Sequence, residues 1–380
     1  MRLFFRAGIV ALLGAGLAAC NKDSAAPVDF DDPAAVSSNL SSVDSTFNSD
    51  VFRSFTVTAF MLDVAAQPSI RPAATLLQTL HPKLERSGAH AFLPGLIQGQ
   101  KLQMLAPQLS LSAAQGAIIP DSMFGRVFEW DTAGVGQYSW QDSTIAGLTG
   151  VRFILYAVGL DGQILEPVTP IGTLDILDAS TANALQLHIL VRNNAGTTTF
   201  VDYTVELTGN SSTVQANAVG SIRNGLAAPN NKELSFDETL TVTSSSIRVT
   251  ARFALNSPAT TLMLNESLSF NTSDLVINTD FRLIQNGHTI RTVGRITVNN
   301  LDAVNVVITV YFDGGPVASL SGDPTLAETQ WVDAGGEPLS PADLAALDDL
   351  LDALSQFHAA LSSLFSPIGT FGGVQALLRQ

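Results

Sequence analysis

Hydrophobic and polar residues alternate with a period of two over most of the chain between residues 121 and 323. Alternation of this kind is typical of β-strands that bury one face of a sheet. Nine segments show it, and RVFEWD and QYSWQD precede them, so about eleven strands are expected. The nine segments are 151–158, 185–192, 199–207, 233–242, 247–255, 261–270, 275–284, 288–298 and 304–312.

Short turns such as LDGQ, NNAG, QNGH and DGGP join many of these segments. Turns of this length connect antiparallel neighbours, so the pattern predicts an antiparallel meander. Within IRVTARFAL, Val249 and Phe253 share one face of the strand, while Arg248 and Arg252 share the other. We therefore expect one face of the sheet to contact water and the other to contact an apolar partner.

Apolar spacings of three and four residues predict one helix on either side of the meander in the sequence. The first covers 33–55, with Asp32 as N-cap and Pro33 at the first helical position. The second covers 341–365, with Ser340 as N-cap, and is about 37 Å long. Its apolar stripe includes Leu344, Leu347, Leu351, Leu354 and His358.

The expected fold is therefore mainly β with flanking α structure. An antiparallel meander of about eleven strands, an open or half barrel, would be covered by an N-terminal and a long C-terminal amphipathic helix. The chain is expected to divide into a signal peptide (1–19), a lipid tether (20–32), a helical and irregular segment (33–120), the meander (121–323), an acidic linker (324–339) and a C-terminal helix with its tail (340–380).

The first twenty residues predict where the protein is located. Arg2 and Arg6 precede a short apolar run that ends in small residues, as in a signal peptide. The tetrapeptide Leu17-Ala18-Ala19-Cys20 resembles the lipobox of bacterial lipoproteins. This resemblance implies cleavage before Cys20, a diacylglycerol thioether on its sulfur and an acylated amino group. A plain signal peptide with a chance cysteine, or an uncleaved anchor, are the alternatives.

The resemblance to lipoproteins also implies a destination: residue 21 is Asn rather than Asp, which by the sorting rule of enteric bacteria favours the outer membrane. The periplasmic and surface faces of that membrane are not distinguished. Several acyl chains would make a durable anchor, so the membrane is an expected partner through Cys20.

Composition excludes several classes of function. The net charge is −15, and loss of Arg2 and Arg6 with the signal peptide makes it −17, so nucleic acid is not an expected partner. Only 14% of the residues are charged and 46% are hydrophobic, as in a folded chain with a large core. Cys20 is the only cysteine, and its lipidation would exclude disulfides, thiolate metal sites and a cysteine nucleophile.

Motifs for catalysis are missing from the sequence. It contains no GxSxG, SxxK or HExxH motif, no Walker loop and no dinucleotide fingerprint after a strand. A non-enzymatic protein without cofactor or metal is expected. His358 is the one histidine in an apolar stripe, where it could be a ligand or a base, or a buried and hydrogen-bonded core residue.

Four aromatic residues are predicted to face one another across the first hairpin, namely Phe128, Trp130, Tyr138 and Trp140. They would form either a platform on which sugars stack or a cross-strand cluster within the core.

An antiparallel half barrel whose apolar face is covered by helices resembles the fold of the lipoprotein carriers LolA and LolB. The likeness is one of architecture, without a shared motif. It implies that the helices at 33–55 and 341–365 are a lid over an apolar groove and that an acyl chain displaces them. A helix packed permanently as core, with no cavity, is the alternative.

The expected function is therefore that of a lipid-anchored envelope protein which binds a lipid or another apolar molecule between sheet and helices. Two alternatives stay open at this point. One is a structural or protein-binding surface lipoprotein that contacts another envelope protein. The other is a protein that binds carbohydrate through Trp130 and Trp140.

Overall fold

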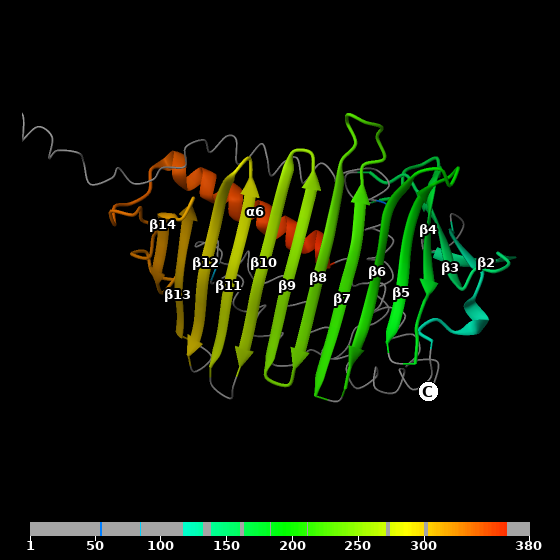
Figure 1. Ribbon diagram of the computed structural model, residues 1–380, viewed down its shortest axis with the longest axis horizontal. Coiled ribbons are helices and arrows are strands. Elements are labelled where there is room, and N and C mark those ends of the chain that lie inside the picture. Colours follow the sequence, from blue (N-terminus) through cyan, green and yellow to red (C-terminus); the bar gives the residue numbers. More distant parts are fainter. Residues whose placement is uncertain are drawn as a thin grey trace, which may run out of the picture.

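The computed structural model describes most of the chain from residue 117 onward (Figure 1). Of the helix at the C-terminal end, side chains are described up to Leu351. The described residues are 117–131, 138–159, 163–182, 184–210, 212–270, 274–299 and 303–362, with Ser54 and Leu84 from the N-terminal third.

One large sheet dominates this part of the chain and contains fourteen strands (Figure 1). Their order across the sheet is β14-β13-β12-β11-β10-β9-β8-β7-β6-β5-β4-β3-β1-β2. The strands are β1 (Arg126–Trp130), β2 (Tyr138–Thr144), β3 (Gly150–Tyr156), β4 (Pro170–Asp178), β5 (Leu185–Asn193), β6 (Thr199–Gly209), β7 (Thr213–Arg223), β8 (Glu233–Thr243), β9 (Ser246–Asn256), β10 (Ala259–Phe270), β11 (Leu275–Gln285), β12 (His288–Asn299), β13 (Ala303–Phe312) and β14 (Gly315–Gly322). A short 3-10 helix, η4 (Asp121–Met123), precedes them.

The expected meander is confirmed from β3 to β14, where every strand pairs antiparallel with the next strand in sequence. Two details differ from the prediction. The number of strands is fourteen rather than about eleven, because β4, β7 and β14 also join the sheet. At the other end β1 forms a hairpin with β2 but pairs parallel with β3, so the sheet is not antiparallel throughout.

Tight turns keep the register between neighbouring strands. Asn286 and Gly287 connect β11 to β12 with φ values of 51° and 85°. Positive φ at both central residues is the requirement of a type I′ hairpin turn, whose twist matches that of the strands. Asp313 and Gly314 repeat this arrangement between β13 and β14, with φ values of 46° and 88°.

The two faces of the sheet differ in burial as the alternation predicts. In β9, the side chains from Ile247 to Leu255 at every second position are buried, and Arg248, Thr250 and Arg252 between them are exposed. We call the face that carries Ile247 the inner face and the opposite face the outer face. Inner-face residues of β3 to β14 belong to one continuous hydrophobic core, which also includes Leu84.

Helix α6 (Pro341–Ser362) lies against the inner face and crosses it obliquely from β14 towards β8 (Figure 1). The Ser340 hydroxyl accepts a hydrogen bond from the backbone N–H of Asp343 at 3.2 Å, which confirms Ser340 as the N-cap. Leu347, Leu350 and Leu351 are buried in the core. The helix predicted at 33–55 lies, except for Ser54, outside the described residues, so coverage of the inner face by two helices stays a prediction.

Candidate functional sites on the two faces of the sheet

Two rows of inner-face residues carry four buried polar residues, Glu238, Glu266, Thr279 and Thr292. In the first, Glu238 of β8 is followed on the next strands by Ala251, Leu264, Phe281 and Thr292 of β12. In the second, Leu240 is followed by Val249, Glu266, Thr279 and Gly294. We call them the Glu238 row and the Glu266 row. They place two carboxyl groups within an otherwise apolar face.

Glu238 is buried, and no described residue forms an ion pair with it. Its residue is 7% exposed, and Oε2 has no hydrogen-bond partner among the described residues. Burial raises the pKa of this carboxyl to about 8, because a charged carboxylate loses its hydration in the core. At neutral pH Glu238 is therefore mostly protonated, and its carboxylic acid group can donate a hydrogen bond.

Glu266 lies two strands away, in the neighbouring row, and is 0% exposed. The Thr279 hydroxyl donates a long hydrogen bond of 3.5 Å to its Oε1. Burial raises the pKa of Glu266 well above its usual value; the bond from Thr279 lowers this pKa, and the nearby Glu238 raises it further. Two buried carboxyl groups with raised pKa values therefore lie two strands apart on the inner face.

Thr292 ends the Glu238 row and adds a third polar group to the core. Its residue is 1% exposed, and its Oγ1 has no partner in the described part of the chain. Buried polar atoms are nearly always hydrogen-bonded in folded proteins, and among the described residues Glu238 and Thr292 are exceptions on one face. Their row therefore combines polar atoms without described partners with an otherwise apolar surface.

The outer face contains an open hollow of about 430 Å³ over strands β8 to β11. Four consecutive strands contribute to it, because the register brings their outward side chains into adjacent positions. The lining residues are Asp237, Thr239, Thr250, Ala251, Arg252, Met263, Leu264, Asn265, Asp280 and Arg282. This volume lies within the usual range for sites that bind small molecules.

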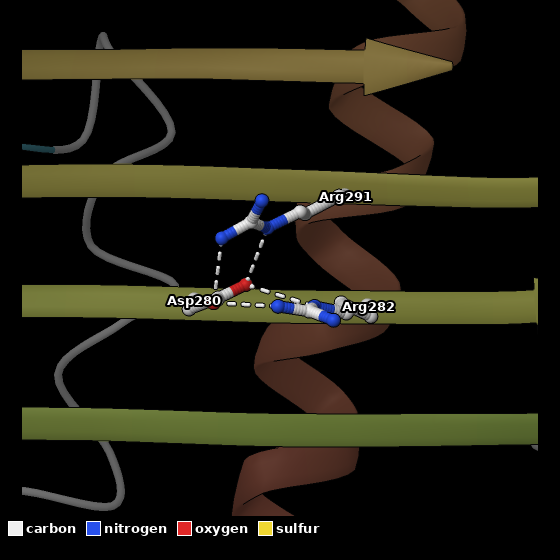
Figure 2. Close-up of polar contacts among 3 residues, drawn as sticks. All are labelled: Asp280, Arg282 and Arg291. Atoms are coloured by element: carbon white, nitrogen blue, oxygen red, sulfur yellow. Dashed lines mark hydrogen bonds and ion pairs between the residues drawn. The ribbon is translucent and has the colours of Figure 1, made fainter. Parts of the chain in front are cut away.

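Asp280 holds two arginines at one side of this hollow (Figure 2). The Arg291 Nε and Nη2 atoms each donate to the carboxylate at 2.9 Å, and the Arg282 Nε and Nη2 atoms donate at 3.3 and 3.2 Å. Figure 2 places these side chains on the face of the sheet turned away from α6. The hydrogen bonds from Arg291, followed by those from Arg282, lower the pKa of Asp280 despite its partial burial.

The aromatic residues of the first hairpin are divided between core and surface. Phe128 stacks on Phe153 with ring centroids 4.6 Å apart, and Tyr138 meets Phe153 and Trp130 edge to face. These contacts favour the core interpretation for Phe128 and Tyr138. Trp140 lies on the edge strand β2, is 57% exposed, and has the Arg126 guanidinium 5.3 Å from its ring centroid.

The expected ligand-binding leucines of the C-terminal helix take different positions. Leu347 and Leu351 are buried in the core, whereas Leu344 is 39% exposed. The side chains of Leu354 and His358, and the whole of Cys20, lie outside the described residues. Leu347 and Leu351 thus form part of the core in this structure, and Leu344 does not.

The two described histidines outside α6 each pair with an aspartate. His188 contacts Asp202 at 2.8 Å on the outer face, and His288 contacts Asp313 at 2.8 Å beside the last hairpins. Within the described ranges, no group of three or more His, Cys, Asp and Glu side chains could hold a metal ion. In the same ranges no helix combines the length and the apolar character needed to cross a membrane.

Comparisons with protein-family models, with curated proteins and with solved structures gave no match to this chain.

Sequence reasoning did not single out the two buried glutamates, although the alternation places them. Glu238 lies at an alternate position between Phe236 and Leu240, so it shares their face of the strand. Glu266 lies in the same way between Leu264 and Leu268. A charged residue in the apolar phase of a strand is the pattern that indicates them. The outer hollow gave no comparable indication, since it depends on the pairing of four strands.

Proposed function

We propose that this chain is a lipid-anchored protein of the bacterial envelope that binds an apolar molecule with a polar head. The binding site is the inner face of the sheet, under α6 and the helix predicted at 33–55. The observation that carries the proposal is the pair of buried polar atoms without described partners, Glu238 Oε2 and Thr292 Oγ1, in a single row of an apolar face.

The energetic argument starts from the cost of such atoms. A buried polar group without a hydrogen bond costs roughly 1–3 kcal/mol relative to one that is satisfied. A hydrophobic residue of similar size at position 238 would avoid this cost. A protonated Glu238 that donates to the head of a bound molecule would recover it, and the apolar remainder of that molecule would extend along the row.

The dimensions of the row agree with a lipid-like ligand. Glu238 and Thr292 lie four strands apart, which is about 19 Å at the usual strand spacing. Half the hydrocarbon thickness of a bilayer, which is the reach of one acyl leaflet, is about 15 Å. Between the two polar positions the row contains Ala251, Leu264 and Phe281, an apolar surface whose side chains differ in size.

Helix α6 would act as the lid in this proposal. Its buried leucines, Leu347, Leu350 and Leu351, occupy the inner face in this structure. An entering acyl chain would replace their contacts with the sheet by contacts of the same apolar kind. The exchange is therefore expected to be close to neutral in free energy.

The test uses the chain from Asn21 onward, which omits Cys20 and therefore carries no lipid anchor, purified gently. Native mass spectrometry, followed by solvent extraction and identification of the extract, should reveal a stoichiometric apolar molecule with a hydrogen-bonding head. Glu238→Leu should stabilise the fold and yet retain less of this molecule, which separates loss of binding from unfolding. Leu351→Glu should also lose it, while Leu344→Glu, at an exposed position of the same helix, should keep it.

A ligand-free mass that does not change after incubation with phospholipid vesicles would refute the apolar ligand. So would Glu238→Leu protein that retains the molecule as well as the parent chain. The anchor is tested separately by expressing the full chain and Cys20→Ser in bacteria given labelled palmitate. Label on the parent and not on the variant is the expected result, and label on neither would refute lipidation.

A further inference from the structure

The middle of the outer face is cationic in a protein that is strongly acidic overall. Strands β9 to β12 place five arginines and one aspartate on this face, a net charge of +4, while the whole chain carries −15. The arginines are Arg248, Arg252, Arg282, Arg291 and Arg295. Three of them, Arg248, Arg252 and Arg295, form no ion pair with any described residue.

The hollow over β8 to β11 overlaps this cationic area, and its charged lining residues are Arg252, Arg282, Asp237 and Asp280. Arg252 of β9 and Arg282 of β11 are both register neighbours of Met263 on β10, so their backbones are about 10 Å apart. The next positions along these strands are Thr250, Asn265 and Asp280, which are adjacent in the same way. Two guanidinium groups therefore flank a shallow floor that carries hydroxyl, amide and carboxylate groups.

Asp280 fixes the geometry of one of these guanidinium groups. Its bonds to Arg282 use Nε and Nη2 and leave the Nη1 donors of that side chain without a role in the pair. Arg291 binds the same carboxylate from the neighbouring strand and so restrains Asp280 as well (Figure 2). Arg282 thereby presents planar donors beside the hollow with less freedom than an unpaired arginine has.

We propose that this hollow binds an acidic saccharide, with Arg252 and Arg282 contacting its carboxylate or phosphate group. Arginine matches either anion with two parallel hydrogen bonds. Asp237, Thr239 and Asn265 supply the mixed donors and acceptors that sugar hydroxyls require, and Met263 supplies an apolar surface for a ring. The site lies on the opposite face of the sheet from Glu238 and does not depend on the ligand proposed there.

The experiment is a titration of the mature chain from Asn21 onward, which keeps every described strand. The probes are glucuronate and glucose 6-phosphate, used at millimolar concentrations and low salt. Glucose is the uncharged control, and inorganic phosphate is the control without a sugar. Binding is followed by chemical shifts of the outer-face arginine side chains. At least one acidic sugar should bind more tightly than glucose and inorganic phosphate. Whichever acidic sugar binds more tightly shows whether the site prefers a carboxylate or a phosphate.

Three variants give this titration its controls. Arg252→Gln should weaken binding by about tenfold or more, equivalent to 1.4 kcal/mol. Arg295→Gln removes the same charge from the same face outside the hollow and should leave binding nearly unchanged. Asp280→Asn raises the net charge by one, so simple attraction predicts tighter binding, whereas a positioning role for Asp280 predicts weaker binding.

Binding of neither acidic sugar would overturn the proposal. Equal losses in Arg252→Gln and Arg295→Gln would also overturn it, since they would indicate a diffuse effect of charge. Phosphate that binds as tightly as glucose 6-phosphate, without binding of glucuronate, would show that the sugar contributes nothing and would refute the saccharide.

Discussion

Replacing Glu238 with glutamine should stabilise the protein at neutral pH. The substitution keeps the shape of the side chain and its ability to donate a hydrogen bond, but it removes the group that ionises. Glu238 is buried on the inner face, and burial raises its pKa to about 8. In the unfolded chain the same carboxyl is exposed to water and titrates near its ordinary value of 4.5.

The sign and the size of the effect follow from these two values. Below pH 4.5 the carboxyl is protonated in both states, and its ionisation costs no stability. Between pH 4.5 and about 8 only the unfolded state releases the proton, so the stability of the folded state falls by about 1.4 kcal/mol per pH unit. The loss amounts to about 3 kcal/mol at pH 7 and reaches a limit of about 5 kcal/mol above pH 8.

The assay is urea unfolding followed by tryptophan fluorescence, with parent and variant compared at pH 4.5, 7 and 8.5. The two chains should have nearly equal free energies of unfolding at pH 4.5, and the variant should exceed the parent by about 3 kcal/mol at pH 7. Glu233→Gln is the matched control on the same strand. Its carboxylate is partly exposed and pairs with Arg223 at 2.9 Å, so its loss should cost less than about 1 kcal/mol.

A constant difference between parent and Glu238→Gln across this pH range would refute the reasoning, because it would show that Glu238 does not exchange its proton between the two states as argued. A variant that is less stable than the parent at pH 7 would refute it as well, since the carboxylate would then be favoured in the core.

Three further substitutions test the packing of the sheet. Asp175→Asn should cost about 2 kcal/mol in urea unfolding, because the buried carboxylate receives two hydrogen bonds from Arg152; no loss would mean that this pair contributes nothing. Leu347→Ala should cost about 3 kcal/mol and expose α6 to limited proteolysis, and unchanged protection would mean that the helix does not depend on its core contacts. Gly220→Ala should destabilise by about 2 kcal/mol or more, because a Cβ would lie 2.3 Å from the Cβ of Tyr203; parent-like thermal unfolding would contradict that contact.

Strands with large apolar residues in alternation could be predicted from the sequence, and β8 to β13 all belong to this group. Strand β7 could not, because its inner face carries Ala216, Ala218 and Gly220. The reason lies in its neighbours: Gly220 pairs with Tyr203 on one side and Phe236 on the other, and these two rings meet with centroids 5.7 Å apart. The small residues of β7 leave space for large ones elsewhere, and one strand alone does not show this.

The candidate sites were accessible to sequence reasoning to different degrees. Glu238 and Glu266 lie in the apolar phase of strands that were predicted, so their burial follows from alternation alone. The outer hollow depends on register: Arg252 and Arg282 are thirty residues apart in sequence, and only the pairing of each strand with Met263 brings them together. Turn lengths constrain such register without determining it, so the hollow required the three-dimensional structure.

From β3 to β14, neighbours in the sheet are also neighbours in the sequence. The sheet can therefore gain or lose a hairpin without rerouting the chain, since removing two adjacent strands leaves the directions and faces of the others unchanged. The outer hollow belongs to a single block of four such strands, from Glu233 to Gln285. The width of the sheet and the chemistry of the hollow are thus separable: hairpins could be added or removed outside this block during evolution without changing the residues that line the hollow.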